Sequence, residues 1–389
     1  MRFGVGFSVD KDSRAAAAAS AAQAAAALGG VRPDLAMVFV SPHHAENWDA
    51  LRQEIRSAAD PVNLLGCTGE SIIAGAREFE DSPAVAVWLA SLPGVDVRTF
   101  ALEFENTPEG PAFLGLPDDL PAAPAEGSAA FLMLGDPFTF PMDGLLERLN
   151  DEFPGRPVIG GMASAANRPG ENRLFLGDQE LPAGAVGAHL CGRFHLRSVV
   201  SQGCRPIGRP LVITKADGQV IHTLGGKPAW EQLRAILEEL PPADAALLRN
   251  GHNLFVGRVI NEYQDAFRRG DFLIRNFRGY DPDSGAVAVM DEFRTGQTIQ
   301  FHLRDAAAAD EELRELLAAA GPASGALLFA CNGRGSRMFN TPDHDAAVLA
   351  EKVGPVPAAG FFCAGELGPV GGRNFMHGFT ASVALFAEA

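Results

Sequence analysis

The chain has 389 residues, of which 47% are hydrophobic and 21% are charged, a composition typical of a folded globular protein. At about 150 residues per domain, this length is enough for two or three domains. The formal net charge of −16 at pH 7 disfavours a role on nucleic acid or on an anionic membrane surface, because so acidic a chain is repelled by phosphate groups.

No apolar run reaches the ~18 residues that a membrane-spanning helix requires. The apolar start of the chain meets charged residues at positions 10–12, too early for a secretory signal. The cysteines are odd in number and none are spaced as Cys-x-x-Cys; they are Cys67, Cys191, Cys204, Cys331 and Cys363. We therefore expect reduced thiols, a cytoplasmic location, and neither a metal site nor a cofactor.

The first 67 residues are predicted to alternate between strands and helices. In chain order the predicted elements are a strand at 3–9, a helix capped at 12–13 and ending at 28, a strand at 35–40, a helix at 45–59 and a strand at 61–65. The third strand runs into a turn of small residues at 66–71.

This β-α-β pattern occurs twice more, with nearly equal length. The second copy has a strand at 129–134, a helix at 141–152 and a small-residue turn at 160–164. The third has a strand at 326–330, a helix reaching 353 and a turn at 360–366. Three such units predict internal duplication, and a degenerate fourth copy is predicted between 253–257 and 271–275.

Other strands follow one another without helices and are predicted to form antiparallel meanders. They lie at 83–90, 95–103, 171–177, 184–190, 194–201, 286–290 and 297–303, while the proline-rich segment 105–128 is predicted to be a loop. The predicted fold is mixed α/β (α+β), with two similar halves of repeated β-α-β units and meanders, and mixed sheets flanked by helices. We place the domains at 1–205 and 206–389.

Segment 66–71 (Gly-Cys-Thr-Gly-Glu-Ser) is the first candidate site. A strand that ends in small residues exposes backbone N–H groups to a ligand. Cys67 is alternatively a small buried hydrophobic residue, or a nucleophile if a base lies beside it.

Segment 331–337 (Cys-Asn-Gly-Arg-Gly-Ser-Arg) is the second candidate. Arginines in a glycine-rich turn can bind a carboxylate or a phosphate through paired N–H groups. The segment lacks the Lys-Ser/Thr ending of a nucleotide-binding P-loop. Arg334 could equally pair with an acid of the protein itself, such as Glu366.

Segments 362–369 and 373–377 contribute Glu366 and His377. Glu70 and Glu366 occupy matching places in two repeats, with Ser164 near the same place in the other. Because ligands bind at the carboxyl ends of parallel strands, we expect the three turns to line one cleft.

These motifs together resemble the FIST domain family, found in bacterial sensory proteins and in some eukaryotic F-box proteins. Residues 30–200, approximately, resemble the N-terminal domain of that family, and the motifs that carry this resemblance lie at 65–70 and 158–161. Residues 220–370, approximately, resemble its C-terminal domain, with motifs at 271–275, 331–335 and 365–369. The resemblance implies a stand-alone intracellular sensory module for small molecules such as amino acids. It supplies no catalytic residues.

We therefore favour a small-molecule-binding module of signal transduction over an enzyme, with an amino acid or a small carboxylate as ligand. The predicted ligand-binding residues are Cys67, Thr68, Glu70, Gly160, Gly161, Arg275, Cys331, Arg334, Glu366 and His377. A ligand carboxylate is expected on Arg334 or on backbone amides, and a ligand ammonium on Glu366 or Glu70. No output domain is recognisable, so we expect a separate signalling protein as partner.

Two alternatives stay open. The first is a cysteine-dependent hydrolase or transferase that uses Cys67, Cys331 or Cys363 with His377, and a thiol of lowered pKa would mark it. The second is a protein-binding adaptor that acts through 105–128 or through an apolar patch.

Overall fold

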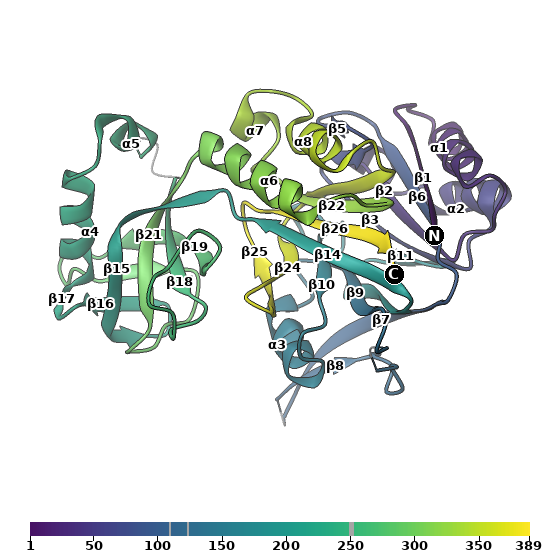
Figure 1. Ribbon diagram of the computed structural model, residues 1–389. Coiled ribbons are helices and arrows are strands. Elements are labelled where there is room, and N and C mark those ends of the chain that lie inside the picture. The colour runs from purple at the N-terminus through teal and green to yellow at the C-terminus, as the bar shows by residue number, and fades with distance from the viewer. Residues whose placement is uncertain (109, 123, 249–252) are drawn as a thin grey trace. The chain divides into compact units, whose positions relative to one another are not determined.

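The computed structural model describes residues 1–108, 110–122, 124–248 and 253–389. The fold is mixed α and β, as predicted, and it divides into two compact units (Figure 1). The first unit is Met1–Val200 with Leu313–Ala389, and the second is Ser201–Glu312. Within the described residues, no helix combines the length and the apolar character needed to cross a membrane.

The first unit is built from three mixed sheets, named here I, II and III. Sheet I has the order β1 (Arg2–Ser8), β6 (Val85–Ser91), β2 (Leu35–Val40), β3 (Asn63–Thr68), β11 (Leu174–Leu176), β12 (Gln179–Leu181). Sheet II has the order β25 (Arg373–His377), β24 (Glu366–Val370), β10 (Val158–Met162), β9 (Ser128–Gly135), β13 (Ala185–Gly192), β7 (Val95–Thr107), β8 (Gly110–Leu114). Sheet III has the order β14 (Phe194–Ser201), β26 (Ala381–Glu388), β22 (Gly325–Cys331), β23 (Ala358–Cys363), β4 (Ile72–Ala74), β5 (Arg77–Phe79).

Each sheet contains one parallel pair of strands, formed by one of the predicted β-α-β segments. The pairs are β2 with β3, β9 with β10, and β22 with β23. The helices that connect them are α2 (Trp48–Ala59), α3 (Met142–Glu152) and α8 (His344–Val353). Helix α1 (Ser13–Leu28) precedes β2, and helix α6 (Ala306–Ala320) precedes β22. Helix α6 begins in the second unit and enters the first unit at Leu313.

The three repeats are interlocked by hairpins that leave their own sheet. The hairpin β4–β5 follows β3 of sheet I but pairs with β23 of sheet III. In the same way β24–β25 follows β23 and pairs with β10, and β11–β12 follows β10 and pairs with β3. Each repeat therefore completes the sheet of another, in a closed cycle.

Strand β2 shows why its sequence is a continuous apolar run. Leu35, Met37 and Phe39 point to a core shared by the three sheets, whereas Ala36 and Val38 pack against the side covered by α1 and α2. Both faces of the strand are buried, so polar residues do not alternate with apolar ones.

One glycine in each parallel pair lies against the neighbouring strand. A Cβ atom on Gly66, Gly160 or Gly360 would lie 2.2, 1.8 or 1.7 Å from a backbone carbonyl oxygen of the facing strand. Real Cβ atoms do not approach backbone so closely, so any other residue at these positions would force the paired strands to shift.

The second unit is an antiparallel barrel. Its strands have the order β15 (Cys204–Asp217), β21 (Thr298–Arg304), β18 (Leu254–Val259), β19 (Phe272–Tyr280), β20 (Val287–Val289), β16 (Val220–Leu224), β17 (Lys227–Pro228). The long strand β15 also pairs with β16 and thereby closes the ring. An apolar core fills this unit, and α4 (Ala229–Glu238) contributes side chains to it. The short helix α5 (Pro242–Leu247) follows α4 in the chain.

Three expectations about these segments are wrong. The degenerate fourth copy does not exist, because β18 and β19 are antiparallel and residues 260–271 contain no helix. The strands expected to form meanders at 83–103 and 171–201 do not do so: β6 lies between β1 and β2 rather than beside β7, and β11, β13 and β14 lie in three different sheets. Segment 105–128 is not only a loop, since β7 and β8 pair within it; its residues 109 and 123 lie outside the described chain.

We expect Gly360→Ala to destabilise the protein by about 1–3 kcal/mol, because the added methyl group overlaps the Leu328 carbonyl group of the facing strand. Gly378→Ala is the control, since a Cβ there meets no atom within 4 Å. Urea unfolding of both variants measures the difference. Equal free energies of unfolding would contradict the close approach.

Candidate functional site

The turns that follow β3, β10 and β23 lie together in the first unit. Backbone N–H groups of Ser164 and Phe362 donate to the carbonyl oxygens of Thr68 and Ser71, at 3.2 and 2.9 Å. Met162 N donates to Gly365 O at 2.8 Å, and Glu70 N donates to Ser164 Oγ at 2.9 Å. Direct hydrogen bonds thus join the carboxyl ends of strands from all three repeats.

Several predicted site residues serve the packing of this centre. Gly161 faces Glu366 across the β10–β24 pairing, and a Cβ on Gly161 would lie 2.3 Å from Cys363 Sγ. Cys67 and Cys363 are buried, and burial raises the pKa of both thiols well above the ordinary value. Neither thiol therefore has the thiolate character of a catalytic cysteine.

Thr68 connects β3 to the hairpin of the second repeat. Its Oγ1 accepts from Arg173 N at 2.9 Å and donates to Arg173 O at 3.4 Å. A buried hydroxyl with both bonds made to backbone has a structural role.

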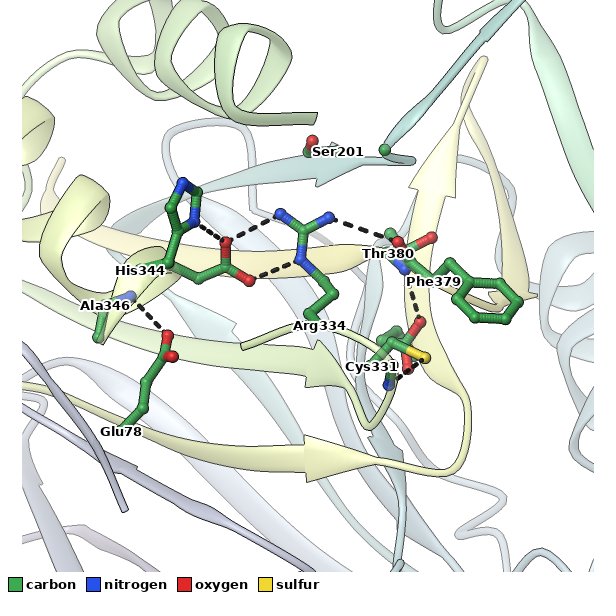
Figure 2. Close-up of polar contacts among 12 residues, drawn as sticks. Glu78, Ser201, Cys331, Arg334, His344, Ala346, Phe379 and Thr380 are labelled. Carbon is green, nitrogen blue, oxygen red and sulfur yellow. Dashed lines mark hydrogen bonds and ion pairs between the residues drawn. The ribbon is translucent and has the colours of Figure 1, made fainter. Parts of the chain in front are cut away.

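Arg334 is the largest charged side chain of the centre and is completely buried. Its Nε and Nη2 donate to the two carboxylate oxygens of Asp345 at 2.6 and 2.9 Å, and Nη1 donates to Phe379 O at 3.4 Å. Figure 2 shows the guanidinium between these two acceptors. The Phe339 ring, from α7 (Ser336–Phe339), lies 5.2 Å from the guanidinium carbon.

Asp345 is the acid that the sequence did not identify as the partner of Arg334. Burial acts to raise the pKa of Asp345, but the charge and hydrogen bonds of Arg334 outweigh it and hold that pKa at about 2. His344 Nδ1 lies 2.9 Å from Asp345 Oδ1, and the His344 ring stacks on Phe339 at 3.4 Å. The alternative that Arg334 pairs with an acid of the protein is therefore correct, and Asp345 is the acid that it binds through two hydrogen bonds.

Glu78, on the hairpin of the first repeat, reaches the same centre. Its Oε1 accepts from Ala346 N at 3.0 Å (Figure 2). Burial, and then the negative charge of Asp345, raise the pKa of Glu78 to about 8. The carboxyl is therefore mostly protonated at neutral pH.

Glu366, Cys331 and His377 form the opposite part of this centre. Glu366 is fully buried, its Oε2 accepts from Thr380 N at 3.1 Å, and burial raises its pKa well above the ordinary value. Burial, and then the charge of Glu366, raise the pKa of the Cys331 thiol to about 12. His377 Nε2 lies 2.9 Å from Gly368 O. The raised thiol pKa argues against a catalytic Cys331.

Glu70 and Arg337 form an exposed ion pair beside the buried one. The Arg337 side chain is 52% exposed and that of Glu70 is 29% exposed. Arg337 Nη1 also donates to Asn332 O at 2.9 Å. In the sequence, Arg337 stands out only as part of its motif, yet it is the arginine of segment 331–337 that solvent reaches.

Arg275 does not belong to the same compact unit as the other predicted residues. It lies on β19 of the barrel, where its Nε is 3.3 Å from Asp291 Oδ2. Asp291 also accepts from Arg258 Nε at 3.0 Å. In the described part of the chain, no three His, Cys, Asp or Glu side chains lie together in an arrangement suited to a metal ion.

We expect Asp345→Asn to destabilise the fold by about 3–5 kcal/mol, because it leaves the Arg334 charge buried without a carboxylate. Glu70→Gln breaks the exposed pair with Arg337 and is expected to cost less than about 1 kcal/mol. Urea unfolding checks both values. A small loss in Asp345→Asn would show that water reaches the Arg334 guanidinium.

We expect the wild-type free energy of unfolding to fall as pH rises from about 5 to about 8, by up to ~1.4 kcal/mol per pH unit for one proton. The folded-state pKa of Glu78, about 8, lies above the ordinary 4.5, so its contribution is full below the lower value and lost through the higher. Glu78→Gln should remove this part of the slope.

Glu147→Gln, on the exposed face of α3, is the matched control and should keep the wild-type pH dependence. Denaturant unfolding at several pH values measures all three proteins. Parallel curves for wild type and Glu78→Gln would contradict the raised pKa.

Comparison with known proteins gives two family matches. Residues 34–227 match the FIST N domain and residues 229–369 match the FIST C domain. These matches are consistent with the expected two halves, whereas the division at 205 and 206 stays a prediction. Similar chains include the uncharacterized protein Mb0898c of Mycobacterium bovis, 44% identical over 100% of this chain and 99% of that one. Rv0628c of Mycobacterium tuberculosis is 45% identical over 100% of both chains.

Proposed function

The chain belongs to the FIST family of sensory and signal-transduction domains, and from this premise we propose that it binds an amino acid or another small carboxylate as its signal. The observation that carries the proposal is the exposed Glu70–Arg337 pair at the point where the turns of the three repeats meet. We further propose a cytoplasmic location and a separate signalling protein that reads the bound state.

The two charges of this pair suit the two ends of an amino acid. A guanidinium binds a carboxylate through two parallel N–H groups, and a carboxylate accepts an ammonium. An exposed ion pair contributes at most about 1 kcal/mol, so a ligand can replace each partner at small cost. The proposed contacts are the ligand carboxylate on Arg337 and the ligand ammonium on Glu70.

This assignment moves the proposed carboxylate contact from Arg334 to Arg337. Arg334 is completely buried and donates to both carboxylate oxygens of Asp345. A ligand carboxylate could bind Arg334 only after displacing Asp345. Breaking such a buried pair costs several kcal/mol. Arg337 lies on the same segment and is reached by solvent.

The segment 331–337 offers a route from the ligand to the protein interior. Arg337 Nη1 donates to Asn332 O at 2.9 Å, and Asn332 N donates to Cys363 O at 3.0 Å. A ligand that pulls Arg337 away from Glu70 therefore acts on the segment that also carries Arg334. This coupling is the proposed origin of the signal.

The raised pKa values of the cysteine thiols do not favour the alternative of a cysteine-dependent enzyme. Burial raises the pKa of Cys67, Cys331 and Cys363, whereas a nucleophilic cysteine needs a lowered pKa.

A thermal-shift screen against amino acids and small carboxylates tests the proposal. A ligand at 100 times its Kd adds ~2.7 kcal/mol of stability, which raises Tm by several degrees in a protein of this size. Arg337→Gln and Glu70→Gln are each expected to reduce the shift strongly, because each removes one of the two ligand contacts.

Arg14→Gln is the matched control, since Arg14 is 56% exposed and pairs with Glu54, which is 24% exposed. It should respond to ligand like the wild type. A flat screen would refute the ligand class. A ligand shift that survives in both Arg337→Gln and Glu70→Gln would refute the site.

A further inference from the structure

A cavity of about 470 Å³ opens in the first unit at the end of sheet II where β9 and β10 begin. Its wall is formed by the start of β9, by the connection from α3 to β10 and by Leu196 of β14. The turns at the meeting point of the repeats follow the opposite, carboxyl ends of β9 and β10. The cavity is therefore a separate place from the Glu70–Arg337 pair, with a volume usual for small-molecule sites.

Arg156 is the cation of this cavity and is half-buried. Its guanidinium carbon lies 4.6 Å from the centre of the Phe153 ring, and Nη1 lies 3.1 Å from His189 Nε2. Within the described chain no carboxylate forms an ion pair with it. Glu152, the acid that lines the cavity, is bound by Arg148 Nε at 2.8 Å.

His189 does not neutralise Arg156. A guanidinium can only donate, so His189 Nε2 must accept and the ring proton must sit on Nδ1. Burial, and then the charge of Arg156, lower the pKa of His189 to about 4, so the ring is neutral. The positive charge in the cavity is thus not balanced by the group it touches.

The remaining donors of Arg156 are arranged for an oxyanion. One N–H of Nη1 meets His189, and neither Nε nor Nη2 donates to any residue in the described ranges. These two atoms form one of the flat faces that bind a carboxylate through two parallel bonds. Burial lowers the pKa of Arg156 without neutralising it, since arginine stays charged in proteins.

Apolar side chains form a part of the remaining wall. Phe153, Pro154, Pro157 and Leu196 line the cavity together with small residues. We propose that this cavity binds a small organic anion, with its carboxylate on the Nε–Nη2 face of Arg156 and its apolar body against Phe153, Pro157 and Leu196. A chain with a net charge of −16 has no general attraction for anions, so binding would come from this local arrangement.

Isothermal calorimetry with benzoate tests the proposal, because benzoate combines one carboxylate with a flat apolar body. Benzamide has the same shape without the charge and should bind at least tenfold more weakly. Inorganic phosphate separates a carboxylate site from a general oxyanion site. Wild-type binding of benzoate is expected at concentrations up to about 10 mM, the range of small fragments.

Variants place the binding at Arg156. Arg156→Gln should weaken benzoate binding at least tenfold, and Arg156→Lys should fall between it and the wild type, because lysine keeps the charge but lacks the paired donors. Glu152→Gln should bind more tightly than the wild type, since it removes the negative charge at the cavity. Arg373→Gln, which changes an exposed arginine paired with Asp151, is the control and should bind like the wild type.

Ligand-free melting of each variant separates a folding defect from lost binding. The proposal is overturned if the folded wild type does not bind benzoate, or if Arg156→Gln binds it as well as the wild type does. Equal affinity for benzamide also overturns it, and tighter binding of phosphate than of benzoate overturns the choice of a carboxylate.

Discussion

The close approach of parallel strands in each repeat is the constraint on which the first unit depends. Glycine at positions 66, 160 and 360 lets the backbone of one strand lie against the carbonyl group of its partner. The strands that end just beyond these glycines continue into hairpins that pair in another sheet. No repeat can complete its own sheet, so none is expected to fold alone. The same arrangement brings the small-residue turns together, because each turn is the point where the chain crosses from one sheet to the next.

Burying the ends of strands and their turns costs free energy, because polar groups leave water, and the paired charges in the centre offset part of this cost. Turns carry polar groups, and most of those in these turns lie inside the unit rather than at its surface, so each buried group needs a partner. Arg334 and Asp345 satisfy one another as a fully buried pair, and burial raises the pKa of both Glu78, to about 8, and Glu366. Burial thus favours the uncharged form of these two acids. The pH dependence of the centre follows from the protons that those carboxyl groups retain.

Local signals in the sequence predicted the elements well and the partners poorly. The helix at Ser13–Leu28 begins where Asp12 accepts from Ala15 N at 2.8 Å and ends at Gly29 with φ 66°, as the capping residues predicted. The apolar run 35–40 predicted a strand for the same reason: side-chain chemistry acts over a few residues. The exchange of hairpins between sheets leaves no such local pattern, so β6 and β7 were expected to pair. Likewise Asp345 lies on a helix with no feature that distinguishes it from a surface acid, and only the fold brings it to Arg334.

Segment 331–337 carries two arginines that differ in burial and in how firmly they are held. The inner one is enclosed, held by a bidentate carboxylate, and costly to disturb. The outer one faces solvent and is held by a pair that contributes little to stability, so its partner can be exchanged. Because only two residues separate Arg334 from Arg337, a change in the partner of Arg337 affects the backbone near Arg334 unless the segment between them is flexible. Asn332 and Phe339 restrain it at both ends, the former through Cys363 O and the latter through the stacked His344 ring. A restrained segment transmits a displacement instead of absorbing it, which is the property that the proposed ligand contact at Arg337 requires.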